Sequence, residues 1–174
     1  MTENKKDLKV FDGINMNNSI DVLKRLKQFR MDGKAEQLKE IIHILKISEH
    51  EEIKNNIVQI LNDLKDKASV PFLIEEIKNS DNKEIQHLLV AACWQNGLDY
   101  GAYFKFFIEL IVDCSYLTAI ETFTVIEVME VELTNEELEQ SIHVLKNSLI
   151  KCEEDKRFLV KELINHLNTK KMAG

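Results

Sequence analysis

Residues 70–99 read VPFLIEEIKNSDNKEIQHLLVAACWQNGLD and contain two amphipathic helical patterns joined by a polar turn. The first pattern follows Ser69, a candidate N-cap, and has Pro71 in its first turn, where a missing N–H costs no hydrogen bond. The turn is a run of asparagine, serine and aspartate. The second pattern ends at Asn96 and Gly97, a pair typical of a left-handed helix C-terminus. This stretch therefore predicts a helical hairpin.

Weaker copies of this hairpin recur along the chain. We expect helix pairs to begin near residues 34, 69, 101 and 135, a spacing of 32 to 35 residues. The last pair begins with a sequence like a capping box, Thr134 followed by Glu137 three residues later. A fixed period of one hairpin is the signature of a solenoid, in which each hairpin stacks on the next and shares its core.

The helical patterns also set the expected domain limits. One further helix, capped by Asn18 or Ser19, precedes the pairs and ends before Gly33. We expect three regions in chain order: a flexible N-terminal arm, a single helical domain and a C-terminal tail, at residues 1–17, 18–168 and 169–174.

Composition supports an all-α, water-soluble protein. One proline and five glycines in 174 residues leave little turn punctuation for a β-rich fold, and helical spacing recurs almost everywhere. The content is 44% hydrophobic and 30% charged. The longest apolar runs are interrupted by Glu109 and Asp113, so no membrane span is expected. Residues 1–9 do not resemble a secretory signal, and three scattered cysteines do not form a disulfide framework, which together predict a cytoplasmic protein.

The hairpin at 70–99 resembles the HEAT repeat family. The matching residues are the start of the first helix, its core positions, the turn and the core positions of the second helix, namely Val70, Pro71, Leu73, Ile74, Ser80, Asp81, Asn82, Glu84, Ile85, Leu88, Ala91 and Ala92. Gln86 stands where the family often has a basic residue. The resemblance implies a right-handed α-α superhelix of the HEAT or armadillo type, with about four hairpins plus an N-terminal helix. Tetratricopeptide repeats share the period, but their signature residues are absent in register.

No catalytic or cofactor-binding motif is present. The glycines form no phosphate-binding loop, and the histidines show no metal-ligand spacing. Cys93 lies in an apolar stripe and reads as a core residue, while the reactivity of Cys114 and Cys152 stays open. We therefore expect a protein that is not an enzyme and that takes no cofactor or metal.

Charge is concentrated in residues 99–139, which hold ten acids and one base, a net charge of −9. Such a patch could steer a basic partner, and it disfavours nucleic-acid binding, which needs a basic stripe. The alternative is a solvated face that only keeps the protein soluble. Aromatic residues cluster beside this region, and most of them are expected in the core. The candidate partner-binding residues are Glu121, Glu127, Glu130, Glu132, Trp94, Tyr100 and Tyr103.

Two functions follow from these patterns, and an enzyme is a third, less favoured alternative. The first is a small HEAT-like scaffold or adaptor that binds a protein partner through shape and charge. The second is a small acidic inhibitor or immunity-type protein that occludes a partner enzyme. The sequence identifies neither the partner nor the oligomeric state.

Overall fold

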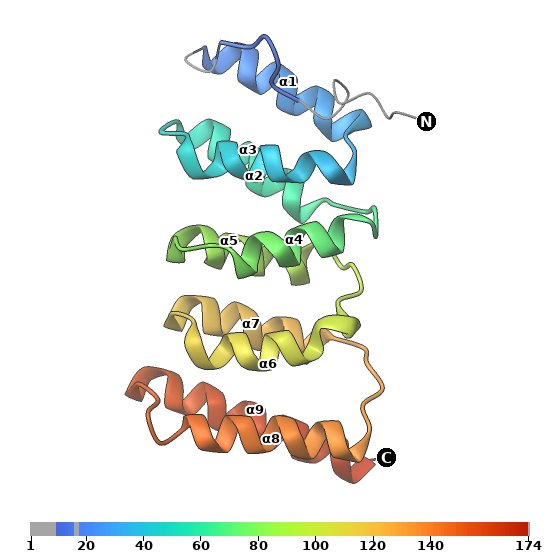
Figure 1. The fold of residues 1–174 in the computed structure, drawn as a ribbon, viewed down its shortest axis with the longest axis vertical. Coiled ribbons are helices and arrows are strands. Elements are labelled where there is room, and N and C mark those ends of the chain that lie inside the picture. The colour runs from blue at the N-terminus through green and yellow to red at the C-terminus, as the bar shows by residue number, and fades with distance from the viewer. Residues whose placement is uncertain (1–9, 16–17, 174) are drawn as a thin grey trace. The chain divides into compact units, whose positions relative to one another are not determined.

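The computed structural model describes residues 10–15 and 18–173, except for the side chains of residues 172 and 173, and the described chain is helical with no strand (Figure 1). This confirms the all-α prediction. The helices are α1 (Ser19–Asp32), η2 (Ala35–Gln37), α2 (Leu38–Ile47), α3 (Glu51–Asn62), α4 (Ser69–Lys78), α5 (Lys83–Gln95), η3 (Gly101–Tyr103), α6 (Phe104–Asp113), α7 (Tyr116–Val128), α8 (Asn135–Ser148) and α9 (Glu154–Ala173), with η marking 3-10 turns. None of the helices in this described part is long and apolar enough to cross a membrane.

The chain divides into two compact units, Met1–Leu98 and Asp99–Gly174. The sequence predicted one domain over residues 18–168, and the division near residue 98 was not foreseen. Each unit contains two of the predicted helix pairs, and these begin at Ala35, Ser69, Gly101 and Asn135, within a residue of the predicted starts.

In the first unit, helices pack both within hairpins and between them. Helix α2 pairs with α3, and α4 pairs with α5. Between hairpins α2 contacts α4 and α3 contacts α5, while α1 packs on α3 (Figure 1). The apolar face of each helix is therefore buried by its partner in the hairpin and by the hairpin next to it.

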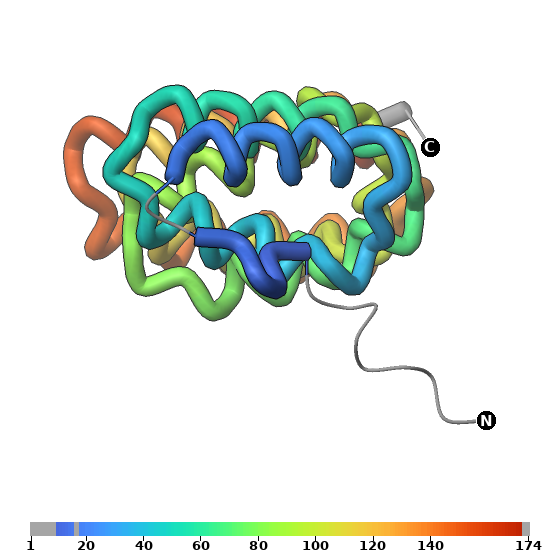
Figure 2. Tube along the Cα trace, turned by 90° about the horizontal axis from the view of Figure 1, so that it is seen from above, coloured from blue at the N-terminus to red at the C-terminus, as the bar shows by residue number. Residues whose placement is uncertain are grey.

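The segment before α1 is anchored to this unit. Val10 and Phe11 are buried, and their N–H groups donate to the two carboxylate oxygens of Glu40 on α2 at 2.6 and 3.1 Å. Seen from above in Figure 2, the segment lies over α2, while α1 lies over α3. Residues 10–15 of the predicted arm are thus held to the unit, because the apolar pair is buried against α2. The rest of that predicted arm, residues 1–9 and 16–17, lies outside the described residues.

Local signals at the helix ends have mixed outcomes. Asn18 accepts the N–H of residue 20 and caps α1, as predicted. Gly97 follows α5 with φ of +68°, the left-handed conformation predicted for it. Ser69 was predicted to be an N-cap, which is wrong. It is the first residue of α4 and is buried, and Asp66 supplies the side-chain acceptor one turn earlier, at the N–H of residue 68.

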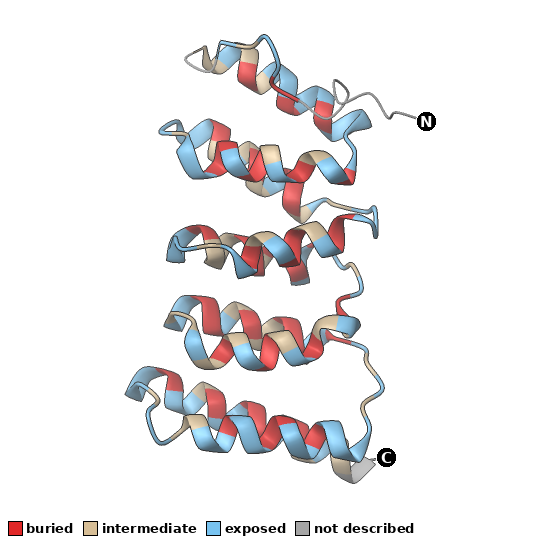
Figure 3. Ribbon diagram, viewed as in Figure 1, coloured by how far each residue is buried: buried red, intermediate tan, exposed pale blue. Residues whose placement is uncertain are grey.

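In the second unit, α6 pairs with α7 and α8 pairs with α9, while α6 contacts α8 and α7 contacts α9. Figure 3 shows buried residues alternating with exposed ones along each of these helices. Helix α9 continues to Ala173, so residues 169–173 of the predicted C-terminal tail are helical.

A buried lysine joins the two hairpins of the second unit. Lys156, in the first turn of α9, is 5% exposed, and its Nζ donates to the carbonyl oxygens of Val112 and Cys114 at 2.6 and 2.9 Å. These carbonyls lie at the C-terminal end of α6, where helix carbonyls lack intrahelical partners and the helix dipole favours a cation. The ammonium group therefore caps α6 from the neighbouring hairpin.

Candidate protein-binding surface

The connection between α7 and α8, residues 129–134, has extended backbone at Met129 and Thr134, runs between them without a helical turn (Figure 1), and is fixed at both ends. At one end, the backbone of Met129 is extended, and its carbonyl oxygen accepts from Lys170 Nζ at 3.5 Å. At the other end, Glu137 accepts from both the N–H and the hydroxyl of Thr134 at 2.8 Å, and its own N–H donates to that hydroxyl oxygen. This confirms the predicted capping box. The hydrogen bonds from the backbone and then the side chain of Thr134 lower the pKa of Glu137, so this carboxylate stays ionised.

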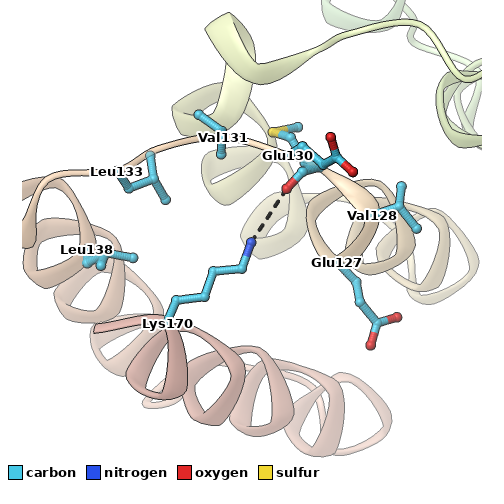
Figure 4. Close-up of a pocket in the computed structure, with 8 residues that line it drawn as sticks. Glu127, Val128, Glu130, Val131, Leu133, Leu138 and Lys170 are labelled. Carbon is cyan, nitrogen blue, oxygen red and sulfur yellow. Dashed lines mark hydrogen bonds between the residues drawn. The ribbon is translucent and has the colours of Figure 1, made fainter. Parts of the chain in front are cut away.

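Two grooves flank the connection, and both are lined by Val131 and Leu133. The α7–α9 groove has a volume of about 560 Å³ and is lined by the end of α7, the connection, Leu138 and Lys170. Figure 4 shows Lys170 reaching from α9 toward the connection, where it bonds to the Met129 carbonyl.

The α6–α8 groove has a volume of about 350 Å³. Its apolar lining includes Phe104 and Ile108 of α6 and Val144 of α8. Three carboxylates also line it, those of Glu109, Glu132 and Glu137, together with one base, Lys105. An apolar surface bordered by carboxylates can take a side chain that combines an aliphatic stem with a positive end.

Three of the four predicted acidic residues gather at these grooves. Glu127 and Glu130 line the α7–α9 groove and Glu132 lines the α6–α8 groove, and all three are exposed. Neither Glu130 nor Glu132 has an ion-pair partner within the described part of the chain. Glu121, the fourth, is half-buried on α7 and lines neither groove.

None of the predicted aromatic residues lines these grooves. Tyr100 is only 3% exposed, and its ring packs edge-on against Phe107 with centroids 6.2 Å apart, so it offers little surface to a partner. An aromatic pair in this geometry is a core contact. Tyr103 is half-buried at the end of η3, and Trp94 is 39% exposed on α5 in the first unit.

Sequence reasoning missed the apolar lining of the grooves. In the connection, Glu130 and Glu132 are exposed while Val131 and Leu133 are half-buried. This is the alternation of a half-buried strand. The signal was present in the sequence as Glu-Val-Glu-Leu, but four residues between two helices are too few to count as a periodic pattern.

The cysteines and histidines do not form a reactive site at these grooves. Burial raises the pKa of the Cys114 thiol to about 11, which keeps it protonated and weakly nucleophilic at neutral pH. Cys93 is buried. Within residues 10–15 and 18–173, no group of three or more histidine, cysteine, aspartate or glutamate side chains is placed to hold a metal ion.

Comparison of the chain with family models, with curated proteins and with solved structures finds no match.

Proposed function

We propose that this protein is a cytoplasmic, non-enzymatic protein-interaction module, a small HEAT-like scaffold or adaptor, and that its second unit binds a basic protein partner. The observation that carries the proposal is the α7–α8 connection, where exposed glutamates alternate with aliphatic residues that line two grooves. An apolar lining bordered by exposed polar groups resembles the apolar core and polar rim of protein-binding surfaces.

Charge supports a basic partner. The second unit contains eight basic and fourteen acidic residues, a net charge of −6, and the acids at the grooves are exposed. An uncompensated negative surface raises the association rate of a positive partner, and it does so most at low salt. The grooves would bury the aliphatic stems of lysine or arginine while the carboxylates contact their charged ends.

The proposal extends to the architecture of each unit. We infer that the hairpins are HEAT-like repeats that stack in a right-handed α-α superhelix. The support is the near-constant spacing of the hairpin starts and the contacts between successive hairpins within each unit. An experimental structure in which successive hairpins turn in the left-handed sense would contradict this inference.

The experiment is a pull-down from the protein's own cells at about 50 and about 500 mM salt, followed by kinetics with the captured partner. We expect capture at low salt only, and the variant Glu127→Gln, Glu130→Gln, Glu132→Gln should associate about tenfold more slowly at low salt because the steering field is reduced. The matched control removes three exposed acids of the first unit, Glu36→Gln, Glu49→Gln and Asp81→Asn, and should keep the parent rate.

Two outcomes would change this proposal. Equal association rates at low salt for the parent and for the variant with Glu127, Glu130 and Glu132 replaced by glutamine would contradict the electrostatic proposal. If the partner is an enzyme and loses activity in the complex, the protein is an inhibitor of the immunity type and not an adaptor.

A further inference from the structure

The backbone of residues 130–133 has unused hydrogen-bonding groups. Within the described part of the chain, the N–H and C=O groups of these four residues make no hydrogen bond. The hydrogen bonds of the connection are confined to its ends, at Met129 and Thr134. A short extended segment is thus held in place while its own donors and acceptors stay available.

The side chains of this segment have two different environments. Val131 and Leu133 are half-buried and line the two grooves, whereas Glu130 and Glu132 are exposed. Figure 4 shows Val131 and Leu133 on the connection above Lys170. An extended backbone with one face attached, one face in water and unpaired polar groups has the properties of an edge strand, which readily pairs with another strand.

We propose that residues 130–133 bind an extended basic segment of the partner by strand addition. This inference rests on the proposed function and specifies how the partner is held. The partner strand would alternate apolar and basic residues, with apolar side chains in the grooves and basic side chains opposite Glu130 and Glu132. Backbone hydrogen bonds would provide the pairing, and the side chains would select the partner.

Charge complementarity selects this occupant over an acidic or neutral strand. Residues 99–139 carry a net charge of −9, and like charges opposite each other on paired strands are unfavourable. A basic helix would satisfy the charge as well, but it forms its own backbone hydrogen bonds and would leave those of residues 130–133 unpaired. Protection of these amides therefore separates the two modes.

The test uses a synthetic peptide, acetyl-KVRVKVR-amide, with the whole protein at low salt. Because alternate N–H groups of a strand point to the same edge, two N-methylated versions are needed, one methylated at the valines and one at the basic residues. We expect the amide hydrogen exchange of one alternate pair, residues 130 and 132 or residues 131 and 133, to slow by about tenfold or more on binding, as hydrogen bonding protects amides. One methylated peptide should bind about tenfold more weakly, while the other binds like the parent peptide.

The outcomes separate this inference from the proposed function. Salt-sensitive binding of the parent peptide, with unchanged exchange at 130–133 and equal binding of both methylated peptides, would overturn strand addition and leave the basic-partner proposal standing. Failure of the peptide to bind, together with unchanged association of the natural partner with the Glu127, Glu130 and Glu132 variant, would overturn both. An acidic peptide of the same pattern, acetyl-EVEVEVE-amide, should not bind, and equal binding of it would also overturn the inference.

Discussion

The two units differ in what their lysines and carboxylates contact. The first unit has fifteen basic and sixteen acidic residues, and its described part contains four ion pairs. Two of these join α2 to α4, from Lys39 to Glu75 at 2.9 Å and from Lys46 to Glu76 at 2.7 Å. The described part of the second unit contains one ion pair, from Lys171 on α9 to a carboxylate on α8.

In the second unit two lysines of α9 contact backbone carbonyls, as Lys65 also does in the first unit. Lys156 caps the end of α6 and Lys170 reaches the carbonyl of Met129. The carboxylates of Glu130 and Glu132 therefore remain without partners in the described chain. Exposed ion pairs typically contribute only about 0–1 kcal/mol, so leaving these carboxylates unpaired costs little stability. Similar hairpins can thus carry either a neutralised surface or a charged one.

The largest predicted effects test whether the cores of the two units are equally well packed. If they are, surface charge is the main difference between the units. Leu89 on α5 and Leu145 on α8 are both 0% exposed. We expect Leu89→Ala and Leu145→Ala each to lower the free energy of unfolding by about 2–5 kcal/mol, because each leaves a cavity in a packed core. Urea unfolding measures both.

The matched control for these core variants is Leu88→Ala, whose side chain is half-buried and should cost less than Leu89→Ala. A loss below about 0.5 kcal/mol at either core position would show that its unit is loosely packed there. The contrast between the units would then be one of packing as well as charge.

An intermediate effect is expected from the lysines themselves. Lys156→Met keeps the aliphatic stem but removes two charge-assisted hydrogen bonds to the end of α6, and should cost about 1–3 kcal/mol. Lys46→Met in the first unit removes an ion pair whose lysine is 30% exposed, and should cost at most about 1 kcal/mol. Equal losses for the two variants in urea unfolding would mean that carbonyl capping and ion pairing are energetically equivalent here.

The helix limits could be predicted from sequence because their signals are local. The caps at Asn18 and Thr134 and the turn at Gly97 act on residues within one helical turn, and the hairpin period follows from apolar spacing. The capping error at Ser69 has the same cause, since a serine before a helix satisfies the local rule whether or not the helix starts one residue earlier.

Contacts between distant residues could not be predicted. The anchoring of Val10 by Glu40 and the capping of α6 by Lys156 join residues about 30 and 44 positions apart. For the candidate site, the acidic positions were visible in the sequence, but the burial of Tyr100 and the grooves beside Val131 depend on tertiary packing. A charge pattern locates an excess of carboxylates, and only the packed structure shows which of them border an apolar groove.

The smallest predicted effect concerns His166 on α9, whose pKa is affected by the charges of Lys170 and Glu127. His166 on α9 has a buried Nε2 with no hydrogen-bond partner in the described chain. Burial lowers the pKa of His166, and the neighbouring ammonium of Lys170 lowers it further, while Glu127 opposes this in part. Below the ordinary pKa of 6.5 the unfolded chain binds this proton more readily than the folded one, so stability should fall as the pH decreases from 7.5 to 5.5.

We expect His166→Gln to reduce that fall, measured as the change in urea midpoint between the two pH values. Lys170→Met should reduce it in part, because the ammonium contributes to the shift, whereas Lys171→Met, which breaks the ion pair with Glu139, should not. Identical pH dependence in the parent and His166→Gln would mean that the pKa of His166 is not lowered, because the charge of Glu127 offsets the burial of the ring. The acids of this unit would then affect the stability of the unit itself as well as the binding of a partner.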